Sequence, residues 1–448
     1  MLPFTSLSLT RILIVALIGY LLVGMVGPGW NGALGLAQPM KESGGDDLWK
    51  AEIENVFIPS DQCKQCHDRH YEEWKGMREQ TPDLKTFGRV DGALLHGTAL
   101  TSPVFKTVLG LWLETKPTAE ERTRCLACHV PAVTVFPQHT DHFIAQVMTR
   151  EKLTRKQKQE LVEGIGCSSC HLINGVKKNP DDFPAFHIKP GKTFFGPYDK
   201  PEDNLVHPSA EAEVYRGVQF CASCHFSKVK DVTQAELSGQ ILKGTVCQDC
   251  HMEPSTGSST SKRGSLTRPI GRHWFQGIVI PGIMLSNRNL QAEWFPRVDV
   301  EIEQKAGNIQ GQVLVRNGSL PHVFPGGDPV LKQFFVTVTV KDAEGHVLGT
   351  QQERFGLDFD KLLRGAIPHP LVNGGTTRRV PFNVAMPADG KPSYVEATLS
   401  FALIPEPSTQ LQEQYLATLD NDGDKQKAKE IIEDYTSKRL LTFRTKSL

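Results

Sequence analysis

The chain has 448 residues, in which 50 Lys and Arg side chains balance 50 Asp and Glu side chains, so its formal net charge is zero. This balance argues against a nucleic acid or an anionic membrane surface as the partner. Because a single hydrophobic core seldom extends beyond about 250 residues, the length predicts two or three domains.

Residues 1–37 have the pattern of an export signal. Arg11 precedes an apolar run from Ile12 to Val26, and a segment of small residues ends at Ala37. If the run is extended to Trp30, its helix would be about 28 Å long, close to the thickness of the bilayer core. Cleavage as a signal peptide and retention as a membrane anchor therefore both stay open. Either one predicts a periplasmic protein or one on the outer face of the cytoplasmic membrane.

A polar linker at 38–58 leads into a region where one motif occurs five times, a Cys-x-x-Cys pair followed directly by histidine. All ten cysteines of the chain belong to these motifs. The motifs are Cys63-x-x-Cys66-His67, Cys125-x-x-Cys128-His129, Cys167-x-x-Cys170-His171, Cys221-x-x-Cys224-His225 and Cys247-x-x-Cys250-His251. Zinc ribbons use such pairs two at a time, which leaves one of five unused, and neither zinc nor disulfides explain a histidine after every pair.

The motif is the attachment site of a c-type haem. Its two thiols can form thioethers with the two vinyl groups of one haem, and the adjoining histidine then becomes the proximal axial ligand of the iron. The sequence therefore predicts five covalently bound haem c groups. The ten cysteines attach them, and His67, His129, His171, His225 and His251 are the proximal ligands.

The haem region is predicted to span 59–295 and to be mainly helical and irregular. Pro103 after Ser102 is typical of the first turn of a helix. Thr118 with Glu121 three residues later has the pattern of a capping box and predicts a short helix before the second motif. Apolar residues at helical spacing predict a further helix over about 141–163.

An all-β domain is predicted at 296–410. Apolar residues alternate with polar ones from Val298 to Ile302, and the same alternation returns in several later segments that are separated by turns. Short strands at this spacing favour an antiparallel sandwich of the immunoglobulin type. The last segment, 411–448, is predicted to be a C-terminal helical tail.

Two segments resemble the cytochrome c554-type multihaem family, whose best-known member accepts electrons from hydroxylamine oxidoreductase. The first is Cys-x-x-Cys-His-x-x-x-Tyr-x-x-Trp at 63–74, and the second runs from Leu95 to Phe105 with a Pro-x-Phe sequence after His96. The family uses the histidine of the second segment as a distal haem ligand, so the resemblance implies that role for His96.

Related multihaem proteins imply three more distal ligands. They have a histidine after a Gly-Pro turn upstream of the fourth motif, which matches His207, and one after the last motif, which matches His273. Some also have a β domain whose first loop sends a histidine back to a haem, and the segment Asn317 to Gly327 matches that loop with His322. Pro321 and Gly326 depart from the relatives' pattern in this loop.

The fifth iron has no such match. His139, His142 and His187 are the candidates, unless the iron is open, and His142 is preferred because it begins a helix close to the second motif. Met148 is the other option and would raise the potential of that haem relative to one with two histidines.

Five haems in about two hundred residues must lie close together, and histidine on both sides of an iron closes it to substrates and lowers its potential. This favours an electron carrier over an enzyme, with a quinol-oxidising membrane complex or a soluble cytochrome as redox partner. Two alternatives stay open: a reductase of nitrogen oxides or hydroxylamine that uses one open haem, and a haem subunit of a membrane redox complex or cytochrome filament. The nitrite-reductase motif Cys-x-x-Cys-Lys does not occur.

Overall fold

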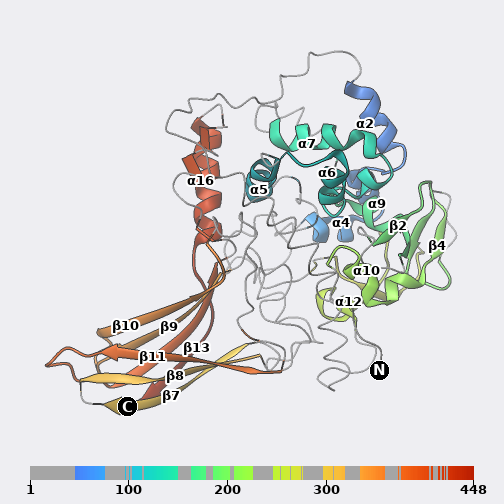
Figure 1. Cartoon of the computed structure of the whole chain (residues 1–448). Coiled ribbons are helices and arrows are strands. Elements are labelled where there is room, and N and C mark those ends of the chain that lie inside the picture. Colours follow the sequence, from blue (N-terminus) through green and yellow to red (C-terminus); the bar gives the residue numbers. More distant parts are fainter. Residues whose placement is uncertain are drawn as a thin grey trace, which may run out of the picture. The chain divides into compact units, whose positions relative to one another are not determined.

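The structure is a computed structural model, and it describes most of the haem region and of the β region (Figure 1). The described residues are 46–75, 96, 100, 103–113, 116–149, 163–177, 185–201, 206–225, 246–252, 254–262, 264–273, 275, 296–305, 307–317, 333–358, 372, 375–402, 405–406, 412–413, 416–417, 419 and 422–448. The predicted export signal and His322 lie outside these residues. Within them, no helix has both the length and the hydropathy needed to cross a membrane.

The haem region is built from short helices, as predicted. The α-helices are α2 (Asp46–Glu54), α3 (Ser60–Lys64), α4 (Asp68–Lys75), α5 (Pro103–Leu113), α6 (Ala119–Leu126), α7 (Thr140–Thr149), α9 (Cys167–His171), α10 (Val218–Ala222) and α12 (Cys247–His251). The 3-10 helices are η4 (Pro131–Thr134), η5 (Pro137–His139) and η7 (Glu213–Arg216). Their termini follow local sequence signals.

The capping box before the second motif is confirmed. The Glu121 amide donates to Thr118 Oγ1 at 3.2 Å, and the Thr118 amide donates to the Glu121 carboxylate at 2.7 Å, so two amides at the start of α6 are satisfied. Pro103 is the first residue of α5, as expected. The helix predicted over 141–163 is present as α7 up to Thr149, residues 150–162 lie outside the described part, and Glu163 is not helical.

The described part of the haem region also contains three small strand pairs. The strands are β1 (Ile173–Val176), β2 (Phe186–Ile188), β3 (Phe194–Gly196), β4 (Ser209–Glu211), β5 (Pro254–Gly257) and β6 (Arg268–Gly271). They pair as β1 with β2, β3 with β4, and β5 with β6. The side-chain core of this region gathers around α6 and α7, where Leu126, Val130, Phe143 and Leu172 are fully buried.

The described part of the β region contains seven strands of nine residues each (Figure 1). They are β7 (Arg297–Lys305), β8 (Asn308–Arg316), β9 (Gln333–Lys341), β10 (Val347–Phe355), β11 (Thr377–Ala385), β12 (Tyr394–Ala402) and β13 (Arg439–Ser447). One sheet has the order β10-β9-β12-β13 and the other the order β11-β8-β7, and every pairing in both is antiparallel.

The inward side chains of both sheets share one core, which includes Val313, Phe334, Val380 and Phe401. This core follows from the alternation in the sequence, because successive side chains of a strand point to opposite faces of its sheet. The region therefore has two antiparallel layers over a common core. The strand order differs in one place from that of a constant-type immunoglobulin domain. There the fourth strand lies in the same sheet as the first, second and fifth strands. Here the fourth strand, β10, pairs with the third strand, β9, in the other sheet.

The C-terminal segment differs from the predicted helical tail. A helix, α16 (Asp422–Thr436), is present, but β13 follows it and pairs with β12 from Tyr394 to Phe401. This strand could not be predicted from the sequence, because Leu440 and Phe443 are 59% and 60% exposed. Its apolar residues therefore do not show the regular alternation of buried and exposed positions by which a strand is predicted. The last residues of the chain thus belong to the sheet.

Candidate haem sites

Each Cys-x-x-Cys-His motif lies on a helical turn. The third and fifth motifs are the helices α9 and α12 themselves. In the first and fourth motifs the histidine amide donates to the carbonyl of the first cysteine, from His67 to Cys63 and from His225 to Cys221, at 2.8 Å in both. Residues three and four positions apart lie on one face of a helix, so the two thiols and the imidazole of a motif can face one planar group.

The cysteines fit haem attachment better than the competing chemistries. All ten are described, and none is in a disulfide. Among the described residues, two groups of three or more metal-ligating side chains come within 4.8 Å of one another, and neither contains a cysteine. A zinc site of the ribbon type would need four such ligands together.

Thiols of different motifs meet in pairs. The Cys63 thiol donates to Cys167, the Cys128 thiol to Cys224, and the Cys221 thiol to Cys247. These hydrogen bonds and burial raise the pKa of Cys63, Cys128 and Cys221. The first motif therefore adjoins the third, the second adjoins the fourth, and the fourth adjoins the fifth.

Three predicted proximal histidines each face a predicted distal histidine across a similar gap. The ring centres are 6.2 Å apart for His67 and His207, 6.3 Å for His96 and His225, and 6.3 Å for His171 and His273. Two metal–nitrogen bonds of about 2 Å, with about 1 Å from each nitrogen to its ring centre, would separate the rings by about 6 Å. The gap between these rings has the size that an iron with two axial histidines requires.

Backbone carbonyls select the nitrogen that can bind iron. The Nδ1–H of His67 donates to Ser259 O at 2.6 Å, that of His171 to Phe195 O at 2.7 Å, and that of His273 to Gly271 O at 3.1 Å. A carbonyl can only accept, so these bonds assign the proton to Nδ1 and the lone pair to Nε2. Metal-bound histidines are commonly oriented in this way.

Burial favours the neutral form of the His96, His171 and His273 rings. Desolvation lowers the pKa of His171, and it lowers that of His96 to about 4 and that of His273 to about 3, with nearby imidazoles acting in the same direction. The neutral imidazole is the form that binds metals. His96 Nδ1 is buried and has no hydrogen-bond partner among the described residues. The residues present thus fit axial ligation of haem.

His142 has different neighbours. Its ring stacks on Trp49 with centres 5.1 Å apart, and it lies 5.5 Å from His139, whose Nε2 is 2.7 Å from Glu52 Oε2. No predicted proximal ligand is among these ring contacts. The ring of His129 stacks on Phe105 at 4.1 Å. His142 and His322, the other two predicted distal ligands, therefore stay predictions.

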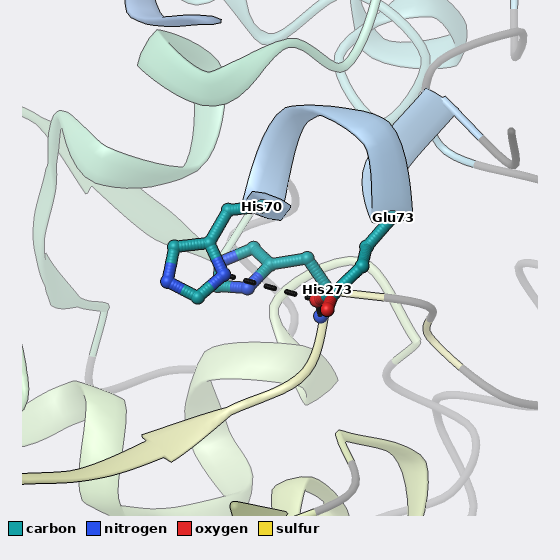
Figure 2. Close-up of side chains that lie close together, drawn as sticks. All are labelled: His70, Glu73 and His273. Atoms are coloured by element: carbon teal, nitrogen blue, oxygen red, sulfur yellow. Dashed lines mark hydrogen bonds and ion pairs between the residues drawn. The ribbon is translucent and has the colours of Figure 1, made fainter. Parts of the chain in front are cut away.

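A buried carboxylate that the sequence did not single out lies beside one of these pairs. Glu73 of α4 is 2% exposed and adjoins His70 and His273, as Figure 2 shows. The carboxylate of Glu73 accepts a hydrogen bond from the backbone amide of His273, two hundred residues further along the chain. The sequence contains no local signal for such a contact, because only the fold brings α4 and the segment after β6 together.

Comparisons with known proteins show the fold. The structure is similar to the crystal structure of a penta-heme cytochrome c552 from Thermochromatium tepidum, with a TM-score of 0.52 and 17% sequence identity over 88% of this chain and 99% of that one. No family model matches the sequence, and no curated protein is similar enough to match. The chain therefore has a multihaem cytochrome fold.

Proposed function

We propose that the protein is an exported pentahaem c-type cytochrome that carries electrons between redox partners through closely packed haems, most of them with two axial histidines. The fold supports this class of protein. The five motifs supply the attachment sites for five haems.

The spacing of the three histidine pairs carries the proposal. Each pair joins a histidine of a Cys-x-x-Cys-His motif to a histidine far away in the sequence, with ring centres 6.2 to 6.3 Å apart. Three separate pairs with the same gap are best explained by three irons with the same coordination. Two histidines fill both axial positions, which favours electron transfer over binding of a substrate.

The contacts between motifs support a continuous path for electrons. The thiol pairs connect the first site to the third, the second to the fourth and the fourth to the fifth. Burial and the proximity of Cys224 raise the pKa of the Cys170 thiol, and this proximity connects the third site to the fourth. Haems attached at these positions would be neighbours in one array, and an electron could cross it in short steps.

The partner, the family and the location form the rest of the proposal. A soluble cytochrome or a quinol-oxidising membrane complex would exchange electrons with the array, and the export signal pattern puts this exchange in the periplasm or at the outer face of the membrane. The segments around His67 and His96 favour the c554-type family. The two-layered β region supports an immunoglobulin-like sandwich, which would offer a docking surface.

Two measurements on the purified holoprotein test the proposal. A pyridine haemochrome assay should give five covalent haems per chain, and an electron paramagnetic resonance spectrum should be dominated by low-spin ferric haem. Three or fewer haems in fully matured protein would contradict the count. A high-spin haem that turns over hydroxylamine or a nitrogen oxide would favour the reductase alternative instead.

A further inference from the structure

The carboxylate of Glu73 joins the helix after the first motif to the segment that carries His273. Its Oε2 accepts the backbone N–H of His273 at 2.7 Å and lies 3.7 Å from His70 Nδ1. Its Oε1 accepts from Arg69 Nε at 3.0 Å and forms an ion pair with Arg272. Both oxygens are therefore held from several directions, and Figure 2 shows how His70, Glu73 and His273 converge.

This carboxylate is charged in spite of its burial. Burial by itself would disfavour a charged carboxylate, but the guanidinium groups of Arg69 and Arg272 and the backbone N–H of His273 surround the oxygens of Glu73 and compensate the charge. A buried charge persists only when such partners surround it, and removal of one partner is costly. Glu73 is thus a fixed anion at a fixed position.

The contacts hold both the backbone and the ring of His273. Glu73 binds its amide and the preceding guanidinium, while Gly271 at the end of β6 accepts from its Nδ1–H. The ring of His70 packs at 4.5 Å against the ring of His273. These constraints leave the His273 ring facing His171 at 6.3 Å.

We infer that Glu73 is a positioning residue that holds His273 in place as the distal ligand of the haem attached through Cys167 and Cys170. This inference rests on the proposed function, since it takes His171 and His273 as axial ligands. It adds a connection between two sites, because α4 starts directly after His67. One short helix then follows the proximal ligand of the first haem and orients the distal ligand of the third.

The test compares full-length holoprotein variants. Glu73→Ala removes the acceptor of the His273 amide, so one haem should change from low-spin to high-spin while five haems stay attached, and added imidazole should restore the low-spin signal. Glu72→Ala is the matched control, because Glu72 lies on the same helix and pairs with Lys64 at 2.5 Å instead. It should leave the spectrum unchanged. An unchanged low-spin count in Glu73→Ala would overturn the inference.

Glu73→Gln keeps the proposal testable if Glu73→Ala fails to mature. It retains an oxygen for the His273 amide but removes the negative charge, so every haem should stay low-spin while the potential of one rises. Unchanged potentials for all five haems would refute the assigned role.

His273→Ala separates this inference from the proposed function. Five covalent haems with an unchanged low-spin count in this variant would overturn both the ligand assignment and the role of Glu73. Absence of covalent haem in the wild-type protein would contradict the proposed function itself.

Discussion

At the scale of single residues, hydrogen bonds decide which histidine nitrogen can bind a metal. Three rings direct Nδ1–H to a backbone carbonyl, and the ring of His207 does so more weakly, with Nδ1 3.3 Å from Pro208 O. The remaining Nε2 of each ring carries the lone pair. A histidine is therefore a good ligand candidate when its neighbours fix this tautomer and when its ring faces a second imidazole at the correct gap.

His207→Ala should convert one low-spin haem to high-spin, because it removes one imidazole of the pair with His67. The haem content should stay at five, since the thioethers do not depend on the distal ligand. His346→Ala is the control, because the His346 side chain lies in the β region and is 77% exposed. Electron paramagnetic resonance of both variants measures the change, and equal spectra for the two would remove His207 from the set of ligands.

Glu73 should make the stability of the protein depend on pH in the acid range. Its pKa falls from 4.5 to about 2 on folding, so its contribution is complete above pH 4.5 and is lost as the pH falls through about 2. A shift of this size corresponds to about 3 kcal/mol. Denaturant unfolding should show the difference between wild type and Glu73→Gln shrinking from pH 5 to pH 2. If the difference in unfolding free energy between wild type and Glu73→Gln did not change with pH, Glu73 would have the same pKa in the folded and the unfolded protein.

At the scale of elements, the β region shows how burial pattern controls prediction. Strands such as β12 alternate buried and exposed side chains, so they could be found from the sequence. The edge strand β13 could not be found in this way, because Leu440 and Phe443 are exposed while Leu441 packs against the core, so its apolar residues show no regular alternation. Its position in the sheet is given by its pairing with β12. The capping box at Thr118 could be predicted because all of its atoms lie within four residues.

A pair of phenylalanine substitutions tests this difference. Phe401 of β12 is fully buried and stacks with Phe334 at 6.1 Å, whereas Phe443 of the neighbouring β13 is 60% exposed. Phe401→Ala should lower the free energy of unfolding by about 3 to 5 kcal/mol. Phe443→Ala should change it by less than about 0.5 kcal/mol. Thermal unfolding followed by circular dichroism measures both, and similar losses would show that β13 packs its apolar side chains against another surface.

At the scale of the whole molecule, the proposed array implies a particular reactivity. If all irons have two protein ligands, cyanide and nitric oxide should bind slowly, because a ligand must first leave. A small soluble redox carrier should nevertheless reduce all five haems quickly. Stopped-flow spectroscopy measures both rates on the same sample. Rapid ligand binding at one haem together with steady turnover of a substrate would contradict a protein that only carries electrons.

The sequence alone predicts five haem attachment sites, because a Cys-x-x-Cys-His motif contains all the atoms that one attachment needs within five residues. The alternation of apolar residues likewise predicted most of the β strands, since it depends only on neighbouring positions. His96, His207 and His273 were named from local resemblance, but that resemblance did not say which iron each would serve.

Only the tertiary structure pairs His207 with His67, His96 with His225, and His273 with His171. The partners in these pairs are separated by about a hundred residues or more, and no local pattern encodes a contact across such a distance. The same holds for Glu73 and the His273 amide, and for β13 and β12. Packing decides these contacts, because the burial of side chains that are remote in sequence is a property of the folded chain.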